Sequence, residues 1–248
     1  MIVGIIPARY SSSRFPGKPL AMIAGKTMIQ RVYEQAAAAK KINHLVVATD
    51  DSRIFDHVKS FGGNVIMTAE NHPSGTDRCY DCLQQLEEKY EYVINIQGDE
   101  PFLHPDQINE IAATCDGNAE LITQMIPVES NEILFDYGEV KIVLNKDNEA
   151  LYFSRNVIPF LKGVPENEWH KKHNYYRHVG LYAYRSDVLK LITQLKPSAL
   201  EIAESLEQLR WLEAGFKIKC VTTSFESHCI DTPEDIEKVI RLMNIKTI

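Results

Sequence analysis

The chain of 248 residues is long enough to bury a substantial core, as one large α/β domain or one domain that carries an insertion. With 44% hydrophobic and 25% charged residues, its composition is typical of a globular protein and excludes a low-complexity chain. The formal net charge of -7 argues against a general nucleic-acid surface, because such binding depends on clustered Lys and Arg side chains.

The N-terminal sequence MIVGIIPARY has too short an apolar run for a signal peptide, and no later run approaches the ~20 apolar residues of a membrane span. We therefore expect a cytoplasmic protein without a membrane partner. The five cysteines are odd in number and scattered, which fits reduced thiols better than a disulfide framework. Cys79 and Cys82 form one C-x-x-C within a helical pattern, without the second ligand pair of a zinc site.

The first hundred residues alternate between short apolar runs and helical periodicity. The run at residues 3–6 predicts a strand, which a polar loop separates from a helix with apolar spacing over 28–36. The same alternation predicts strands at 44–49, 63–67 and 92–96, and helices at 52–61, opening with Ser52 as its cap, and 76–90. Such alternation is typical of a doubly wound, mostly parallel sheet that binds its ligand beyond the carboxyl ends of the strands.

The pattern changes at about residue 120. Strand-like segments with few helical signals between them fill residues 120–185, and we interpret this part as a mixed-sheet subdomain within a single domain spanning 1–248. A predicted helix at 199–213, a strand at 217–222 and a helix at 233–243 then complete the domain. Pro233 suits the first turn of the last helix, where its missing N–H needs no partner.

The loop after the first strand concentrates basic residues. It reads PARYSSSRFPGKPL, and it places Arg9, Arg14 and Lys18 among three serines and Gly17. Backbone N–H groups of such a loop can surround phosphate oxygens while the cations neutralise their charge. It lacks the G-x-x-x-x-G-K-[ST] pattern of a Walker loop. The sequence predicts a triphosphate site, with an exposed polar loop as the alternative.

Two acidic segments are candidate metal ligands. Asp99 and Glu100 follow the strand at 92–96 directly, in NIQGDEPF, where Gly98 allows a sharp turn. Magnesium in proteins prefers one or two carboxylates together with substrate phosphate oxygens. Asp231 precedes Thr-Pro in CIDTPEDIEKV, and local chemistry alone also accounts for it as a helix cap.

Five motifs together resemble those of the 3-deoxy-manno-octulosonate (Kdo) cytidylyltransferases, also called CMP-Kdo synthetases, over nearly the whole chain. They are IPARYSSSRFPGKPL, NIQGDEPF, YRHVGLYAYR, SLEQLRWLEAGFKI and IDTPEDIEKV. The resemblance implies a Rossmann-like nucleotidyltransferase sheet whose mixed-sheet insertion forms a homodimer. It also implies that CMP passes from CTP to the anomeric hydroxyl of Kdo, giving CMP-Kdo and pyrophosphate for lipopolysaccharide synthesis.

The resemblance also implies roles for individual residues. Lys18, Asp99 and Asp231 would be catalytic, and the two aspartates would bind Mg²⁺. The nucleotide would contact residues of the first loop and of the segment 72–78, namely Pro7, Ala8, Arg9, Arg14, Lys18, Ser74, Gly75 and Arg78. The sugar pocket would be lined by Gln97, Arg155, His178, Tyr182, Glu207 and Gln208.

Several alternatives stay open at this point. His178 and Tyr182 share one face of a strand and could be ordinary core residues, while Glu207 and Gln208 could lie on a solvated helix face. The substrate could be another acidic sugar, such as 8-amino-Kdo or a sialic acid, or the protein could be a nucleotide-binding regulator without catalysis. The chain also departs from the family pattern at Cys229, where the family usually has Gly, so the seating of Asp231 depends on a different backbone.

Overall fold

The computed structural model describes residues 1–11, 15–226 and 228–242, and the chain divides into two compact units. The first unit comprises residues 1–113 and 226–248, and the second comprises 114–225. The subdomain expected at 120–185 lies inside the second unit. That unit extends to residue 225 because the last strand of the chain, β11 (Ile218–Thr222), pairs with the strand at its start, β7 (Leu121–Pro127).

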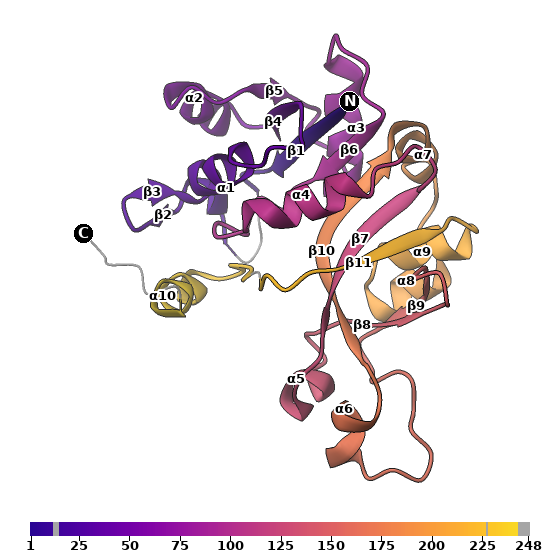
Figure 1. Cartoon of the computed structure of the whole chain (residues 1–248). Helices are drawn as coiled ribbons and strands as arrows, with labels where there is room; N and C mark the ends of the chain where they lie inside the picture. The colour runs from indigo at the N-terminus through magenta and orange to yellow at the C-terminus, as the bar shows by residue number, and fades with distance from the viewer. Residues whose placement is uncertain (12–14, 227, 243–248) are drawn as a thin grey trace. The chain divides into compact units, whose positions relative to one another are not determined.

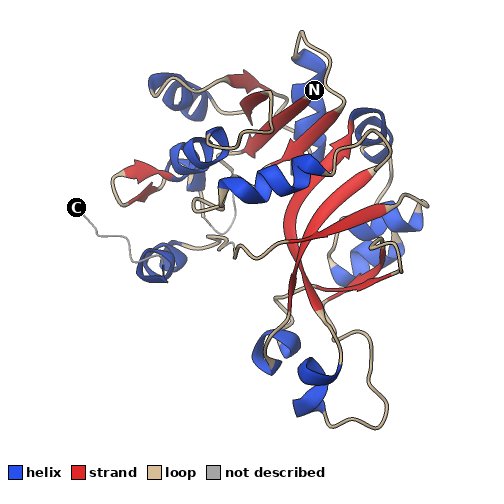
Figure 2. Cartoon of the chain, viewed as in Figure 1, coloured by secondary structure: helices blue, strands red, loops and turns tan. Residues whose placement is uncertain are grey.

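A parallel sheet forms the centre of the first unit. β1 (Ile2–Ala8) pairs in parallel with β4 (His44–Thr49) on one side and with β6 (Tyr92–Asn95) on the other, and β5 (Val65–Met67) follows β4. Continuous apolar runs suit such strands because both faces are covered. These strands confirm the expected parallel sheet, which Figure 2 shows in red.

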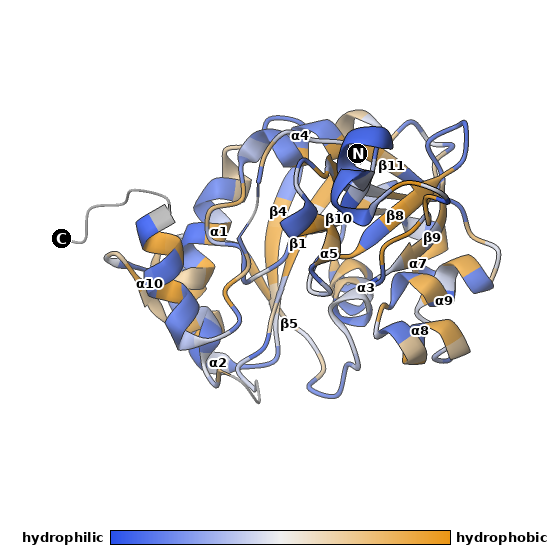
Figure 3. Ribbon diagram, turned by 90° about the horizontal axis from the view of Figure 1, so that it is seen from below, coloured by the Kyte–Doolittle hydropathy of each residue, from blue (hydrophilic) through white to orange (hydrophobic). Residues whose placement is uncertain are grey.

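Helices cover both faces of these strands. Figures 1 and 3 show α1 (Met28–Ala37) and α4 (Pro105–Ala113) on one face and α3 (Gly75–Gln85) on the other. α2 (Ser52–Ser60) packs against β4 and β5. The buried core between these layers consists of aliphatic side chains from strands and helices, including Val3, Ile5, Ile6, Val32, Val47, Ile54 and Ile94.

Side-chain caps fix where the helices begin. Thr27, Asp51 and Ser74 each accept a hydrogen bond from a backbone N–H in the first turn of α1, α2 and α3. The cap of α2 is therefore Asp51, and the expectation of Ser52 was wrong by one residue. α3 also ends earlier than expected, because Leu86 adopts an extended conformation. The short 3-10 helix at Lys18–Leu20 and the hairpin of β2 (Met22–Ile23) and β3 (Lys26–Thr27) were not foreseen.

The last helix, α10 (Pro233–Leu242), begins at the expected proline and belongs to the first unit. Figure 3 shows that it carries hydrophilic and hydrophobic residues on different sides. Val239 and the partly buried Ile236 and Ile240 pack in a cluster with Ile23 and Met28. This packing attaches the C-terminal segment to the hairpin region near the N-terminus. Met243, the expected last residue of the helix, lies outside the described residues.

The second unit is built on a mixed sheet. β10 (Tyr176–Arg185) pairs antiparallel with β7 and with β8 (Lys141–Leu144), β8 pairs antiparallel with β9 (Ala150–Ser154), and β11 runs parallel to β7. The strand-like segments expected over 120–185 are confirmed as β7, β8, β9 and β10. The helices between and after the strands are short, and their bounds are α5 (Asn131–Phe135), α6 (Trp169–Lys172), which follows a 3-10 turn at Glu166–Glu168, and α7 (Ser186–Ile192).

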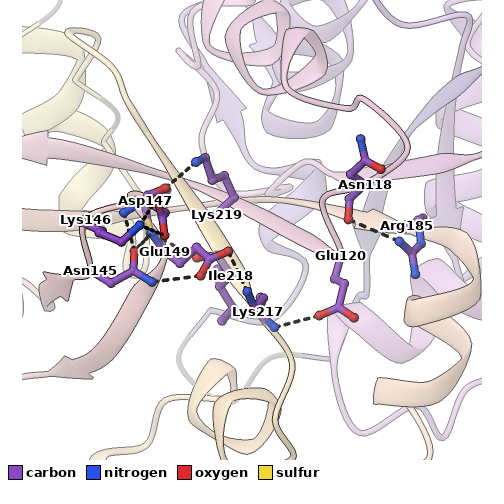
Figure 4. Close-up of polar contacts among 11 residues, drawn as sticks. Asn118, Glu120, Asn145, Lys146, Asp147, Glu149, Arg185, Lys217, Ile218 and Lys219 are labelled. Atoms are coloured by element: carbon purple, nitrogen blue, oxygen red, sulfur yellow. Dashed lines mark hydrogen bonds and ion pairs between the residues drawn. The ribbon is translucent and has the colours of Figure 1, made fainter.

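Polar contacts fix β11 beside its neighbours, as Figure 4 shows. The backbone N–H of Lys217 donates to Glu120 Oε2 at 2.9 Å, and the Lys217 ammonium lies 3.3 Å from Glu149 Oε1. The Lys219 ammonium donates to the backbone carbonyl of Asp147. These contacts join the start of β11 to Glu120, Glu149 and Asp147, and they therefore help to fix where the strand begins.

The helix expected at 199–213 is two helices, α8 (Ala199–Glu204) and α9 (Gln208–Glu213). Ser205 interrupts it with a left-handed backbone conformation, at φ 54°. α8 opens with a capping box between Ser198 and Glu201, and the Arg210 guanidinium of α9 pairs with Glu201. The helical periodicity of the sequence was interpreted correctly, but it carries no signal for this break.

Cys79 and Cys82 lie in α3, and both are fully buried cysteines that form no disulfide. Desolvation by burial raises the pKa of Cys82 to about 12, so its reactive thiolate is disfavoured. Within the described residues, no further His, Cys, Asp or Glu side chains form a metal-binding group with this pair. The two cysteines therefore act as small core residues. None of the helices in the described part of the chain is long and apolar enough to cross a membrane.

Candidate active site

One cavity of about 240 Å³ opens at the carboxyl ends of the parallel strands in the first unit. Segments from four places in the sequence line it: the end of β1 and the loop after it, the start of α3, the turn after β6, and the segment just before α10. The lining residues are Pro7, Ala8, Arg9, Lys18, Pro19, His72, Pro73, Ser74, Gly75, Arg78, Gln97, Gly98, Asp99 and Asp231. The cavity thus brings together residues nearly the full length of the chain apart, at the edge where open α/β sheets bind ligands.

Lys18 is the central charge of this cavity. Its ammonium donates to Asp99 Oδ2 at 2.7 Å and to the backbone carbonyl of Ile230 at 2.7 Å, and it lies 3.5 Å from Asp231 Oδ1. Burial alone would lower the pKa of Lys18, but the charge and hydrogen bond of Asp99 and the charge of Asp231 raise it above its ordinary value. Lys18 is therefore an ammonium ion at neutral pH.

The turn after β6 holds Asp99 against the first strand. Gly98 packs so closely that a Cβ atom at this position would lie 2.8 Å from the backbone oxygen of Pro7. The backbone carbonyl of Asp99 accepts a hydrogen bond from the N–H of Ile230 at 3.0 Å. These contacts hold the backbone segments that carry the two carboxylates next to each other.

The N-terminus of α3 borders the cavity through Ser74 and Gly75. Ser74 caps this helix by accepting the N–H of Asp77. Arg78 is almost fully buried one turn later, and its guanidinium donates to Asp50 Oδ2 and Thr68 Oγ1, each at 2.7 Å. Because Asp50 neutralises its charge, Arg78 supplies this wall with a rigid, hydrogen-bonded group rather than a free cation.

Arg9 is exposed at the mouth of the cavity, and it makes no hydrogen bond or ion pair with any other described residue. It is thus available to an anion. The loop beside it is closed by a hydrogen bond from the N–H of Gly17 to the carbonyl of Tyr10 at 2.9 Å, and the Arg53 guanidinium lies 3.3 Å from the centre of the Tyr10 ring. Arg14, the third basic residue expected in this loop, lies outside the described residues.

Asp99 and Asp231 meet the chemical requirements of a divalent-metal site. Their carboxylate oxygens, together with the sulfur of Cys229, lie within 4.8 Å of one another. The ammonium of Lys18 lies between the two carboxylates, whose negative charges favour positive charge at this position. Two carboxylates beside an open cavity suit magnesium, which also takes oxygen ligands from water or substrate.

All the residues expected at the sugar pocket, except Gln97, lie in the second unit. The Arg155 guanidinium is held by two backbone carbonyls, donating to Glu204 O at 2.9 Å and to Tyr137 O at 3.2 Å. The Glu204 carboxylate is occupied elsewhere, because it accepts from Ser154 Oγ and from the backbone N–H of Arg155. No carboxylate is paired with the Arg155 guanidinium within the described residues, so it keeps its charge for an anionic group.

His178 and Tyr182 are neighbours on β10, with ring centroids 5.2 Å apart. Nε2 of His178 lies 3.0 Å from Thr123 Oγ1, and desolvation lowers the pKa of this histidine to about 3. It is therefore a neutral imidazole at neutral pH, which can form hydrogen bonds but supplies no positive charge. The hydroxyl of Tyr182 is buried near Thr123, and desolvation by burial raises the pKa of this tyrosine well above its ordinary value.

Glu207 and Gln208 mark the start of α9. Gln208 is buried, and its side-chain Nε2 has no hydrogen-bond partner among the described residues, as is also true of Trp211 Nε1 one turn later. Buried donors without partners destabilise a protein by about 1–3 kcal/mol each unless water or a ligand satisfies them. For Gln208, this excludes the expected alternative of a solvated helix face.

Sequence reasoning missed three contributors to the site. The Ile230 carbonyl binds Lys18 through the backbone, so its residue type gives no signal. The Asp50 partner of Arg78 and the Arg53 side chain over Tyr10 come from elements that are not next to the motifs in sequence. The sequence offered one clue to Asp50: it follows a buried parallel strand. Asp99 was predicted as a site residue because it also follows such a strand.

Known proteins are similar to this chain in sequence and in fold. The cytidylyltransferase family profile matches residues 3–218. A protein of Parabacteroides distasonis named 3-deoxy-manno-octulosonate cytidylyltransferase is 55% identical over 247 residues, which cover 97% of this chain and 97% of that protein. A protein of the same name from Cytophaga hutchinsonii is 51% identical, with 96% of each chain covered.

Solved structures agree with these relatives. A CMP:2-keto-3-deoxy-manno-octonic acid synthetase in complex with CTP superposes with a TM-score of 0.90 at 42% identity, covering 98% of both chains. A 4-diphosphocytidyl-2C-methyl-D-erythritol synthase from Anaerococcus prevotii matches with a TM-score of 0.62 at 14% identity, again over 98% of both chains. The second similarity shows the shared fold alone, and both confirm the α/β fold class.

Substituting Gly98 by alanine tests the close approach of the two strand ends. Because the new Cβ would lie 2.8 Å from the Pro7 oxygen, the turn must move, and we expect Gly98→Ala to lower the free energy of unfolding by about 1–3 kcal/mol. Gly138→Ala is the matched control, since its Cβ would meet only the Asp136 carboxylate at 3.1 Å, at the end of a side chain that can move. Urea denaturation measures both; equal stability of the two variants would contradict the proposed packing.

The burial of His178 predicts a dependence of stability on pH. In the unfolded chain this histidine takes up a proton near its ordinary pKa of about 6.5, whereas the folded protein resists protonation down to about pH 3. Folding stability should therefore fall as the pH drops from about 6.5 towards 3. We expect this fall to be less steep in His178→Gln, by up to about 1.4 kcal/mol per pH unit.

Urea denaturation at a series of pH values provides the measurement for His178. The exposed His104→Gln is the control for the loss of a histidine elsewhere in the chain. Parallel stability curves for wild type and His178→Gln would show that the imidazole is not desolvated.

Proposed function

The chain is a nucleotidyltransferase of the cytidylyltransferase family that transfers CMP from CTP to 3-deoxy-manno-octulosonate (Kdo), and we propose that it does so with magnesium, Lys18, Asp99 and Asp231. The single observation that carries the residue assignment is the ammonium of Lys18 between two carboxylates in the strand-end cavity. In this arrangement, an ammonium that can bind phosphate and two carboxylates that can bind a metal ion belong to one hydrogen-bonded cluster.

The cavity suits a nucleoside triphosphate. Arg9 and Lys18 supply positive charge, and the N-terminus of α3 adds the partial positive charge of a helix dipole beside Ser74 and Gly75. Arg78, paired with Asp50, lies at the same wall and can donate hydrogen bonds, while the ion pair as a whole adds no net charge. We assign this wall to the nucleotide, with Pro7 and Ala8 forming the floor at the end of β1.

Asp99 and Asp231 would hold the magnesium ion. When bound, the ion would neutralise charge on the α-phosphate and favour the deprotonated form of the attacking hydroxyl. Lys18 would then be free to donate to a phosphate oxygen, since the ion and the ammonium compete for the same carboxylates. The Ile230 carbonyl keeps the Lys18 side chain at the cavity throughout.

The reaction is a single in-line displacement. The anomeric hydroxyl oxygen of the sugar forms a bond to the α-phosphorus of CTP, the bond to the bridging oxygen breaks, and pyrophosphate leaves with the electron pair. The hydroxyl proton is lost to the medium. Such transfers depend on positioning and charge neutralisation, so no covalent enzyme intermediate is needed. Lys18 and Arg9 stabilise the charge that builds on the phosphates.

The acidic sugar needs a cation and several hydrogen-bond donors. Among the described residues, Arg155 offers a guanidinium without a carboxylate partner and Gln208 offers buried amide donors without a partner, while Tyr182 offers a buried hydroxyl. His178 offers a neutral ring nitrogen. We assign these residues, with Gln97 and Glu207, to the sugar. The unpaired donors support this assignment because a hydroxyl-rich ligand would satisfy them.

We further propose a cytoplasmic homodimer that supplies CMP-Kdo for lipopolysaccharide synthesis. Large apolar side chains are exposed in the middle segment of the second unit, with Tyr137 67%, Leu151 62% and Phe160 71% exposed. We assign the contact between the two copies to the segment that carries these exposed side chains. The mass of the purified protein in solution tests this assembly.

Release of pyrophosphate tests the function directly. The purified protein is incubated with magnesium and each of the four nucleoside triphosphates, with and without Kdo. We expect release only when CTP and Kdo are both present, because the transfer needs both substrates.

Two other outcomes would change the assignment. Release with 8-amino-Kdo or a sialic acid but not with Kdo would keep the chemistry and replace the substrate. Tight CTP binding without release under any condition would instead support a regulatory protein that lacks catalysis.

The metal assignment predicts the effect of Asp99→Asn. The substitution keeps the shape of the side chain but removes its charge, so we expect turnover to fall by roughly two to three powers of ten. Asp106→Asn is the matched control, because this aspartate is exposed in the first turn of α4, seven residues away. Steady-state kinetics at saturating magnesium measure both variants. Wild-type turnover in Asp99→Asn would refute a role for this carboxylate in catalysis.

A further inference from the structure

The hydroxyl of Thr123, on β7, lies at an irregularity of the mixed sheet in the second unit. The register between β10 and β7 shifts after Val179, so that Gly180 and Leu181 lie between two successive cross-strand pairs. Thr123 Oγ1 is 3.1 Å from the carbonyl oxygen of Val179 and 3.0 Å from that of Leu181. Thr123 is fully buried, and its hydroxyl therefore helps to hold this bulge of β10 against β7.

The same hydroxyl also meets the ring of His178, because Nε2 of that ring lies 3.0 Å from Thr123 Oγ1. A hydroxyl group has one proton, and a carbonyl oxygen can only accept. The proton of Thr123 therefore points to one of its two carbonyl neighbours, since otherwise both of them would face oxygen lone pairs. Oγ1 then offers a lone pair to His178, and the hydrogen bond between them requires a proton on Nε2.

This bond decides which ring nitrogen of His178 can accept a hydrogen bond. Because desolvation lowers its pKa to about 3, the imidazole is neutral at neutral pH and carries a single ring proton. With that proton on Nε2, the lone pair of Nδ1 is open, and Nδ1 makes no hydrogen bond with any described residue. The rings of Phe153 and Tyr182 pack against the partly exposed His178, with centroids 5.3 and 5.2 Å away. Nδ1 is therefore the ring nitrogen that remains for a ligand.

We propose that Thr123 is a positioning residue, which keeps His178 as the Nε2–H tautomer and so presents Nδ1 to the substrate as a hydrogen-bond acceptor. This inference rests on the proposed function, in that it takes the substrate to be an acidic sugar held in part by His178. An acceptor nitrogen binds a hydroxyl group, which can donate, and repels a carboxylate, which can only accept. His178 therefore selects a hydroxyl of the sugar, and the sugar carboxylate lies at a donor such as Arg155.

NMR of the whole chain, labelled with ¹⁵N at histidine and free of substrate and metal, measures the tautomer at neutral pH. Protonated and unprotonated ring nitrogens resonate in separate ranges, and couplings to the carbon-bound ring protons distinguish Nε2 from Nδ1. The signals of His178 are those that disappear in His178→Gln. Thr123→Val removes the hydroxyl with little change of shape, and Thr123→Ser keeps it. Thr223→Val is the control, because it removes a buried hydroxyl elsewhere in the second unit.

We expect a protonated Nε2 and an unprotonated Nδ1 in the wild type, in Thr123→Ser and in Thr223→Val. In Thr123→Val the Nε2–H would face a methyl group, so the proton should move largely to Nδ1, where water can accept it. A wild-type ring protonated at Nδ1 would overturn the proposal, even if Thr123→Val did not fold. Unchanged His178 signals in a folded Thr123→Val would overturn it as well, because the tautomer would then not depend on Thr123.

Steady-state kinetics test whether the tautomer affects the sugar. In Thr123→Val we expect the KM for Kdo to rise roughly two- to tenfold, the change that one neutral hydrogen bond produces, while the KM for CTP stays the same. Thr123→Ser should restore the wild-type value, since it restores the hydroxyl. An equal rise in KM for both substrates, or no rise for Kdo, would contradict a positioning role for Thr123.

The two proposals fail separately. Pyrophosphate release from CTP and Kdo by a wild-type protein whose His178 is protonated at Nδ1 would leave the transferase assignment intact and remove the role of Thr123. A Thr123-dependent Nε2–H tautomer without pyrophosphate release would leave the tautomer assignment intact and remove the assigned reaction.

Discussion

The ammonium group of Lys18 joins three segments that are far apart in the sequence. It bonds the turn after β6 through Asp99 and the segment before α10 through the Ile230 carbonyl and Asp231. Without the ammonium, the carboxylates of Asp99 and Asp231 would repel each other at this distance and destabilise the folded protein. The Lys18 ammonium offsets this repulsion, so the geometry of the cavity depends on the lysine.

The same arrangement explains how a site for anions can exist in a chain of net charge -7. Most positive groups near the cavity are already paired, Arg78 with Asp50 and Lys18 with Asp99. Positive potential towards a phosphate therefore comes from Arg9, from the start of α3 and from whatever cation joins the two aspartates. An anionic ligand and a metal ion should consequently bind more strongly together than either does alone, since each neutralises the charge of the other.

The parallel sheet was predictable from the sequence because its strands are continuous apolar runs between amphipathic helices. Lys18 and Asp99 were predictable as neighbours because both follow strands whose carboxyl ends share one edge. The break at Ser205 was not, since a left-handed residue in a helical pattern depends on packing rather than on local preference. The hydrogen bond from Lys18 to the Ile230 carbonyl was not predictable either. Every residue has a backbone carbonyl, and only the fold determines which one the ammonium meets.

The order of the segments along the chain has a consequence for synthesis on the ribosome. The second unit is inserted in the sequence between the two parts of the first. Lys18 and Asp99 are therefore translated before it, whereas Asp231 is translated after it. A nascent chain that has already formed its parallel strands therefore has an ammonium with only one of its two carboxylates. The cavity therefore reaches its final charge only after the inserted unit has been translated, late in the synthesis of each molecule.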